Sequence, residues 1–224
     1  MTLKVVTSGT ASGAVAEFVP KLIADKVASR IAAKDFTLWG KDAEAESSIR
    51  LGWVNSAEDS APLIDSIIAL REEFAAKGVT RFVLCGMGGS SLAPEVITRT
   101  AGVELVVLDS TNADQVGAAL AGDLSKTAIV VSSKSGSTVE TDSQKRIFEK
   151  AFTDAGIDKT DRIVIVTDPG SPMEAAAKAD GYRVFTADPT VGGRYSALTA
   201  FGIVPSGLAG ADIAQLLKDA QDVA

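Results

Sequence analysis

A run of hydroxyl side chains around one lysine is the densest chemical feature of this sequence. Residues 132–138 read Ser-Ser-Lys-Ser-Gly-Ser-Thr, with Lys134 at the centre, and they stand between an apolar run and a helical pattern. Hydroxyl donors, a lysine and the free N–H groups at the start of a helix suit a phosphate group. The loop lacks the Gly-Lys-Ser/Thr ending of a Walker A motif, so it does not predict nucleoside triphosphate hydrolysis. An ordinary helix cap, which needs only one hydroxyl, is the alternative interpretation.

A second loop is rich in glycine. Residues 86–91 read Gly-Met-Gly-Gly-Ser-Ser, again between an apolar run and a helical pattern. Glycines let the backbone come close to a ligand, and the N–H groups of the following helix point toward it. A dinucleotide site is one alternative, with Asp109 as its ribose acid, but Ser91 stands where the G-x-G-x-x-G motif needs its third glycine. A tight strand-to-helix turn that binds nothing is the other alternative.

A third loop presents an arginine. Residues 191–196 read Val-Gly-Gly-Arg-Tyr-Ser. The two glycines allow the guanidinium of Arg194 to be presented from a tightly packed loop, and arginine suits a developing oxyanion. An exposed arginine at a helix start is the alternative.

Three carboxylates have the residue type of a general base, but each falls in a helical pattern where a solvated carboxylate is usual: Glu95, Glu140 and Glu174.

The composition excludes several kinds of chemistry. Among the 224 residues there is no histidine, which excludes Ser-His-Asp triads, imidazole acid–base catalysis and histidine metal sites. The single cysteine, Cys85, rules out an intrachain disulfide and falls in an apolar run, where we expect a core residue. The net charge of −7 disfavours nucleic acid and anionic membranes as partners. We therefore expect no metal, no cofactor and a cytoplasmic location.

The elements that position these loops follow from the hydrophobic pattern. Helical spacing appears at 14–33 and 61–77. We expect Trp39 and Trp53 to pack these N-terminal helices against the sheet domain. Five β-branched apolar runs then alternate with helical patterns; the runs are 81–85, 103–108, 128–132, 163–166 and 182–185, and the helical patterns are 91–100, 113–120, 138–155 and 173–179. This alternation predicts an α/β fold, a three-layer αβα sandwich with a five-stranded parallel sheet. Ligands of such sheets lie beyond the carboxyl ends of the strands, where all three loops fall.

Taken together, the three loops resemble the signature segments of the glucose-6-phosphate isomerase family, in the same order and strand context. The tripeptides Leu-Trp-Gly at 38–40 and Leu-Gly-Trp at 51–53 are similar to the bacterial branch of that family. The resemblance implies a flavodoxin-like sugar-isomerase (SIS) domain at residues 78–193. It implies an N-terminal helical segment at 1–77 packed on that domain, and a helical connector at 194–224 toward a second SIS domain absent from this chain.

The resemblance also implies roles for individual residues. Gly89 and Ser90 contact the sugar, while Gly193 and Arg194 stabilise a cis-enediolate. The phosphate is held by Ser133, Lys134, Ser135 and Thr138. The implied reaction is the aldose–ketose isomerisation of glucose 6-phosphate and fructose 6-phosphate, an intramolecular oxidoreduction without a cofactor, carried out by a homodimer.

The resemblance limits what this chain is expected to do alone. In the family, the glutamate base and the ring-opening histidine and lysine lie in later segments, and this chain stops before them. We therefore expect the chain to bind a hexose phosphate, to need the remainder of the parent chain as a partner, and to be inactive by itself. Two other classes stay open: a SIS-type sugar-phosphate-binding regulatory module, which needs no arginine at position 194, and a dinucleotide-binding oxidoreductase.

Overall fold

The computed structural model describes residues 4–224 and contains a five-stranded parallel sheet. The strand order is β2-β1-β3-β4-β5, which is the flavodoxin-like order. The strands are β1 (Arg81–Gly86), β2 (Val106–Leu108), β3 (Thr127–Ser133), β4 (Ile163–Thr167) and β5 (Arg183–Thr186). The predicted α/β fold with a five-stranded parallel sheet is confirmed.

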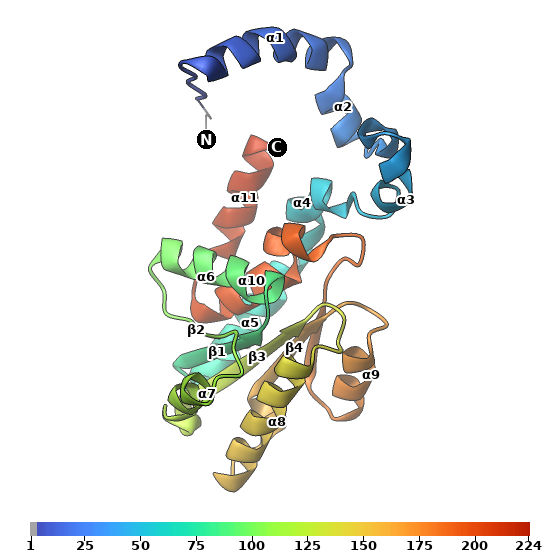
Figure 1. Cartoon of the computed structure of the whole chain (residues 1–224). Coiled ribbons are helices and arrows are strands. Elements are labelled where there is room, and N and C mark those ends of the chain that lie inside the picture. Colours follow the sequence, from blue (N-terminus) through green and yellow to red (C-terminus); the bar gives the residue numbers. More distant parts are fainter. Residues whose placement is uncertain (1–3) are drawn as a thin grey trace.

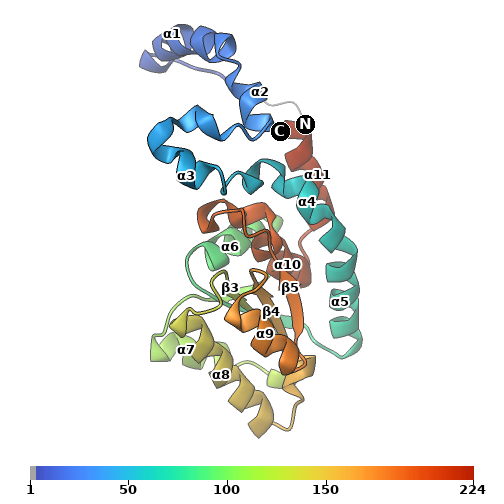
Figure 2. The ribbon, with the colours of Figure 1, turned by 90° about the vertical axis from the view of Figure 1, so that its right-hand side faces the viewer.

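Helices cover both faces of the sheet, as Figures 1 and 2 show. The helices between the strands are α6 (Gly89–Ala101), α7 (Ala113–Leu120), α8 (Val139–Asp154) and α9 (Pro172–Ala179). Before and after the sheet lie α5 (Ile64–Ala76), α10 (Ala200–Ala209) and α11 (Ile213–Val223). In Figure 2, α5 and α8 lie on opposite sides of the sheet.

Two hydrophobic cores follow from the alternation of side chains along the strands. Val130 of β3 packs in the core formed with α5 and α10, whereas Ile129 and Val131 pack in the core formed with α7, α8 and α9. Every residue of β3 is buried, which explains why its apolar run is continuous. Cys85 is fully buried in the second core, and burial raises the pKa of its thiol to about 12. It is a core residue, as predicted.

The N-terminal part differs from its prediction. The helix expected at 14–33 is two helices, α1 (Thr10–Ala24) and α2 (Val27–Ala32), because Lys26 adopts a left-handed conformation with φ of 53°. No residue of α1 or α2 is buried, and Figure 1 shows them reaching away from the sheet. Trp39 is 44% exposed, contrary to expectation, whereas Trp53 is partly buried.

Short helical segments complete the chain. Those before the sheet are η1 (Phe36–Trp39), η2 (Lys41–Ala43), α3 (Glu44–Ser47), η3 (Gly52–Asn55), α4 (Ser56–Ser60) and η4 (Ala61–Leu63). The later ones are η5 (Leu124–Lys126) before β3, η6 (Lys159–Asp161) before β4 and η7 (Gly193–Leu198) after β5. Within residues 4–224, no helix has the length and apolar character needed to cross a membrane. The division into segments 1–77, 78–193 and 194–224 stays a prediction.

Candidate functional site

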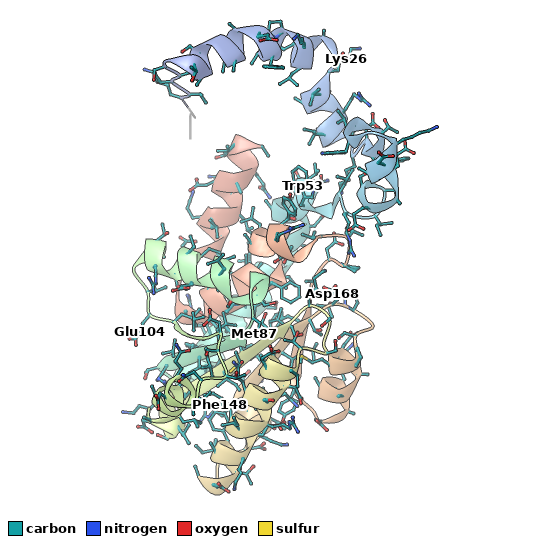
Figure 3. All side chains as sticks on the ribbon, viewed as in Figure 1. Lys26, Trp53, Met87, Glu104, Phe148 and Asp168 are labelled. Atoms are coloured by element: carbon teal, nitrogen blue, oxygen red, sulfur yellow. The ribbon has the colours of Figure 1, made fainter. Side chains whose placement is uncertain are left out.

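The three loops border one cavity of about 450 Å³ beyond the carboxyl ends of β1, β3 and β4. The glycine loop (residues 86–91) contributes Met87, Gly89 and Ser90, the hydroxyl loop (residues 132–138) contributes Lys134, Ser135 and Thr138, and the third loop (residues 191–196) contributes Gly193 and Ser196. Arg50, Asp168 and Phe201 complete the lining. An adjoining cavity of about 470 Å³ shares Arg50, Gly89, Lys134 and Gly193 with the first and adds Arg194. Figure 3 labels Met87 and Asp168 at the edge of the sheet where these loops leave it.

The glycine loop and the third loop touch at a pair of glycines. A Cβ atom on Gly89 would lie 2.5 Å from the carbonyl oxygen of Gly193 and 2.9 Å from its carbonyl carbon. No side chain fits into that distance, so the approach requires glycine at position 89. The structure thus brings together the residues that the resemblance assigns to the sugar and to the enediolate.

Hydrogen bonds of Ser133 organise the hydroxyl loop. Its hydroxyl donates to Oγ1 of Thr138 at 3.0 Å and accepts from the backbone N–H of Gly136 at 3.2 Å. Ser133 is buried beneath the loop and does not line either cavity, unlike the other three residues predicted to hold phosphate. Thr138 is the N-cap residue of α8, but its side chain makes no capping hydrogen bond. A simple helix cap therefore does not account for the hydroxyls of this loop.

Lys134 forms an ion pair inside the first cavity. Its Nζ lies 2.6 Å from Oδ2 of Asp168 and 5.9 Å from the centre of the Phe201 ring. Burial raises the pKa of Asp168 and outweighs the opposing effect of the hydrogen bond from Lys134. The other carboxylate oxygen of Asp168 is buried and has no partner among the described residues. The sequence motifs did not point to Asp168. It nevertheless follows β4 directly and so lies where ligand-binding residues gather in such sheets.

Two arginines add positive charge to the second cavity. Arg194 is exposed and makes no hydrogen bond or ion pair with any residue in the range 4–224, so its guanidinium is available to a ligand. Arg50 lines both cavities, and no motif around it predicted this position. Together with Lys134, these arginines gather positive side chains around the two cavities in a protein whose net charge is −7.

No free general base lines this site in the described part of the chain. The lining carboxylates are Asp168, paired with Lys134, and Glu46, whose Oε1 lies 3.0 Å from Nε of Arg50. The carboxylates weighed in the sequence lie outside both cavities, and two of them pair within their own helices, Glu95 with Arg99 and Glu174 with Lys178. Residues 4–224 also hold no cluster of three or more metal-ligating side chains. The arrangement can bind an anion and stabilise a developing negative charge.

Several known proteins are similar to this chain in sequence. A probable glucose-6-phosphate isomerase from Haloarcula marismortui is 37% identical over 146 residues, covering 63% of this chain and 34% of the relative. A glucose-6-phosphate isomerase from Thermus thermophilus is 35% identical over 182 residues, covering 79% of this chain and 43% of the relative. The chain thus spans less than half the length of these curated relatives.

Solved structures agree with the sequence comparison. A hypothetical protein from Thermus thermophilus superposes with a TM-score of 0.77 at 32% identity, covering 94% of this chain and 49% of that one. A glucose-6-phosphate isomerase from Chlamydia trachomatis gives a TM-score of 0.60 at 26% identity, covering 80% of this chain and 34% of that one. The family model described as phosphoglucose isomerase matches residues 62–223. By this match and by its relatives, the chain belongs to the phosphoglucose isomerase family.

Proposed function

We propose that this chain supplies the phosphosugar-binding part of a glucose-6-phosphate isomerase, an enzyme that interconverts glucose 6-phosphate and fructose 6-phosphate. The observation that carries the proposal is the meeting of the hydroxyl loop, the glycine loop and Arg194 around two adjoining cavities. The names of the relatives supply the substrate class.

The phosphate group is proposed to bind at the start of α8. Ser135 and Thr138 offer hydroxyl donors, Lys134 offers a charge, and the first N–H groups of α8 have no partner within the helix. Ser133 acts indirectly, because its hydroxyl bonds to Thr138 and to the loop backbone. A dianionic phosphate entering here would draw Lys134 away from Asp168 or share it.

The reacting carbons are proposed to lie toward the third loop. Isomerisation moves a proton between C2 and C1 of the open-chain sugar and passes through a cis-enediolate, which carries a negative charge. In this proposal Arg194 stabilises that charge with the backbone of Gly193 beside it, and Gly89 and Ser90 contact the sugar. The lining of the two cavities by these four residues supports these roles. Such a contact is stronger in the transition state than in the ground state, so it accelerates the reaction.

The general base is proposed to come from outside these 224 residues. Both carboxylates that line the described cavities are already paired with cations, and the sequence contains no histidine. The chain alone is then expected to bind a hexose phosphate without isomerising it. Activity would require the remainder of a full-length enzyme, which acts as a homodimer in this proposal.

A regulatory sugar-phosphate sensor is the competing function, and the position of Arg194 argues against it. Two ligands separate the two functions: arabinonate 5-phosphate, whose carboxylate carries the charge of an enediolate, and arabinitol 5-phosphate, which lacks that charge. By calorimetry we expect the chain to bind the aldonate at least about tenfold more tightly, or about 1.4 kcal/mol. Equal affinities would contradict the proposal that Arg194 stabilises an enediolate and would favour a regulatory sensor.

A further inference from the structure

The loop that presents Arg194 is contacted by a segment far away in the sequence, residues 50–53. We propose that Arg50, Gly52 and Trp53 form a clamp that fixes this loop and thereby positions the guanidinium of Arg194 for the enediolate. This inference rests on the proposed function. The clamp lies outside residues 62–223, the range that the family model matches.

The first contact of the clamp is a hydrogen bond from Arg50. Its Nη1 donates to the carbonyl oxygen of Pro189 at 2.9 Å, across a separation of 139 residues in the sequence. The Nε atom of Arg50 donates to Oε1 of Glu46 at 3.0 Å, which orients the guanidinium. Arg50 therefore holds the loop on the N-terminal side of Gly192 and Gly193.

The second contact is the close packing of the loop on Gly52. A Cβ atom at this position would lie 2.1 Å from Oγ1 of Thr190 and 2.7 Å from Oδ2 of Asp188. Those two side chains are themselves fixed, because Asp188 accepts hydrogen bonds from the backbone N–H and the hydroxyl of Thr190 at 2.7 and 2.6 Å. Any side chain at position 52 must push aside the side chains of Thr190 and Asp188, which form this turn of the loop.

The third contact lies on the C-terminal side of Arg194. The ring of Trp53 stacks on the ring of Tyr195, with 5.9 Å between the centroids and 26° between the planes. Figure 3 labels Trp53 above the sheet. Because Tyr195 follows Arg194 directly, this stack fixes the loop immediately beyond the arginine.

Arg194 depends on these contacts because its own side chain has no other support. Within residues 4–224 the guanidinium makes no hydrogen bond or ion pair, so only the loop backbone limits where it can reach. Stabilisation of a developing charge depends steeply on geometry, and a displacement of about 1 Å can cost on the order of 10²-fold in rate. The clamp thus holds both sides of the loop and leaves the guanidinium free for the ligand.

The test compares two ligands in the same chain. Calorimetry with arabinonate 5-phosphate and arabinitol 5-phosphate gives an affinity ratio in which the shared phosphate contacts cancel. The ratio therefore reports on the groups that meet the carboxylate, which are proposed to include Arg194. For Gly52→Ala and Trp53→Leu, two clamp positions that line neither cavity, we expect this ratio to fall from at least about tenfold to less than about threefold. The affinity for arabinitol 5-phosphate is expected to change by less than about twofold.

Matched controls make the same substitutions elsewhere. Gly117→Ala adds a Cβ atom into open space, and Trp39→Leu removes an indole ring that is 44% exposed. Both controls are expected to keep the wild-type ratio. If Gly52→Ala fails to fold, Trp53→Leu with its Trp39→Leu control provides the measurement by itself.

Two outcomes would overturn the clamp. Clamp variants that fold and keep the wild-type ratio would show that the loop positions Arg194 unaided. Equal losses for both ligands would show that these residues act on the phosphate or on the whole site. A wild-type chain with no preference between the ligands is a different result, because it would overturn the proposed function and the clamp with it.

Discussion

The Nζ atom of Lys134 lies 2.6 Å from Oδ2 of Asp168, and this ion pair joins the ends of β3 and β4 inside the first cavity. The pair neutralises the charge of Asp168, which would otherwise repel an anionic ligand. It also holds Lys134 beside the hydroxyl loop, where the phosphate is proposed to bind. The charge balance of the cavity therefore depends on Asp168 as well as on the cations.

The ionisation of Asp168 predicts a pH dependence of stability. Because burial raises the pKa of Asp168 above its usual 3.8, the folded chain binds this proton more tightly than the unfolded chain does. The resulting stabilisation is fully present below pH 3.8 and is lost as the pH rises through the raised pKa. Asp168→Asn cannot ionise, so its free energy of unfolding relative to wild type should increase as the pH rises through that window.

Urea unfolding of both proteins, from about pH 3.5 to pH 6, checks this difference, since other carboxylates contribute equally to both. A difference that moves in the opposite direction would mean that the Lys134 bond outweighs burial.

The hydroxyl loop predicts a strong effect of added negative charge. Thr138→Asp places a carboxylate at the start of α8, where the phosphate is proposed to bind. Calorimetry should show at least about a tenfold loss of hexose-phosphate affinity, or about 1.4 kcal/mol. Thr153→Asp adds the same charge in the last turn of the same helix and should leave the affinity unchanged. If Thr138→Asp also binds normally, the loop does not belong to the site.

The contact between Gly89 of the glycine loop and Gly193 of the third loop predicts that position 89 tolerates no side chain. In Gly89→Ala, the new Cβ atom must push the carbonyl of Gly193 away, because the two would otherwise be 2.5 Å apart. We expect a loss of stability of about 1–3 kcal/mol by urea unfolding, together with weaker hexose-phosphate binding. Gly117→Ala, in the open part of α7, should show neither effect. Wild-type stability in Gly89→Ala would contradict the close approach of the two loops.

Arg194 should matter more for turnover than for binding. In the active full-length enzyme, Arg194→Ala is expected to lower kcat by on the order of 10²- to 10³-fold and to change KM little, because the enediolate forms only after the substrate binds. Steady-state kinetics measures both constants, with Arg99→Ala as a control for the loss of a surface arginine. A change confined to KM would make Arg194 an ordinary binding residue.

The sheet was predictable because its signals are local. Strands such as β3, buried on both faces, read as continuous apolar runs, and all five runs appear in the structure as strands. The break between α1 and α2 was not predictable, since the apolar spacing continues through Lys26 and nothing in it indicates a left-handed residue. Helix spacing reports which side chains share a face and does not report a single backbone angle.

The site was predictable only where residues follow strands. Most of the residues assigned from the three loops line the cavities, and Asp168 follows β4 by the same rule. Ser133 lies beneath its loop, because it is the last residue of β3 and its side chain turns inward. The position of Arg50 in the site was not predictable from the sequence, because only the packing of residues 50–53 on the third loop brings it there.

Binding without turnover is the central claim, and one titration tests it most directly. Fructose 6-phosphate is added to the purified 224-residue chain while backbone amide resonances are followed by NMR, and the same samples are assayed for isomerisation with a coupled enzyme. We expect saturable shifts at Ser135, Thr138 and Gly193, none with unphosphorylated fructose, and no isomerisation above the buffer rate. Absence of saturable shifts at these residues, or isomerase turnover that survives repurification, would contradict the account.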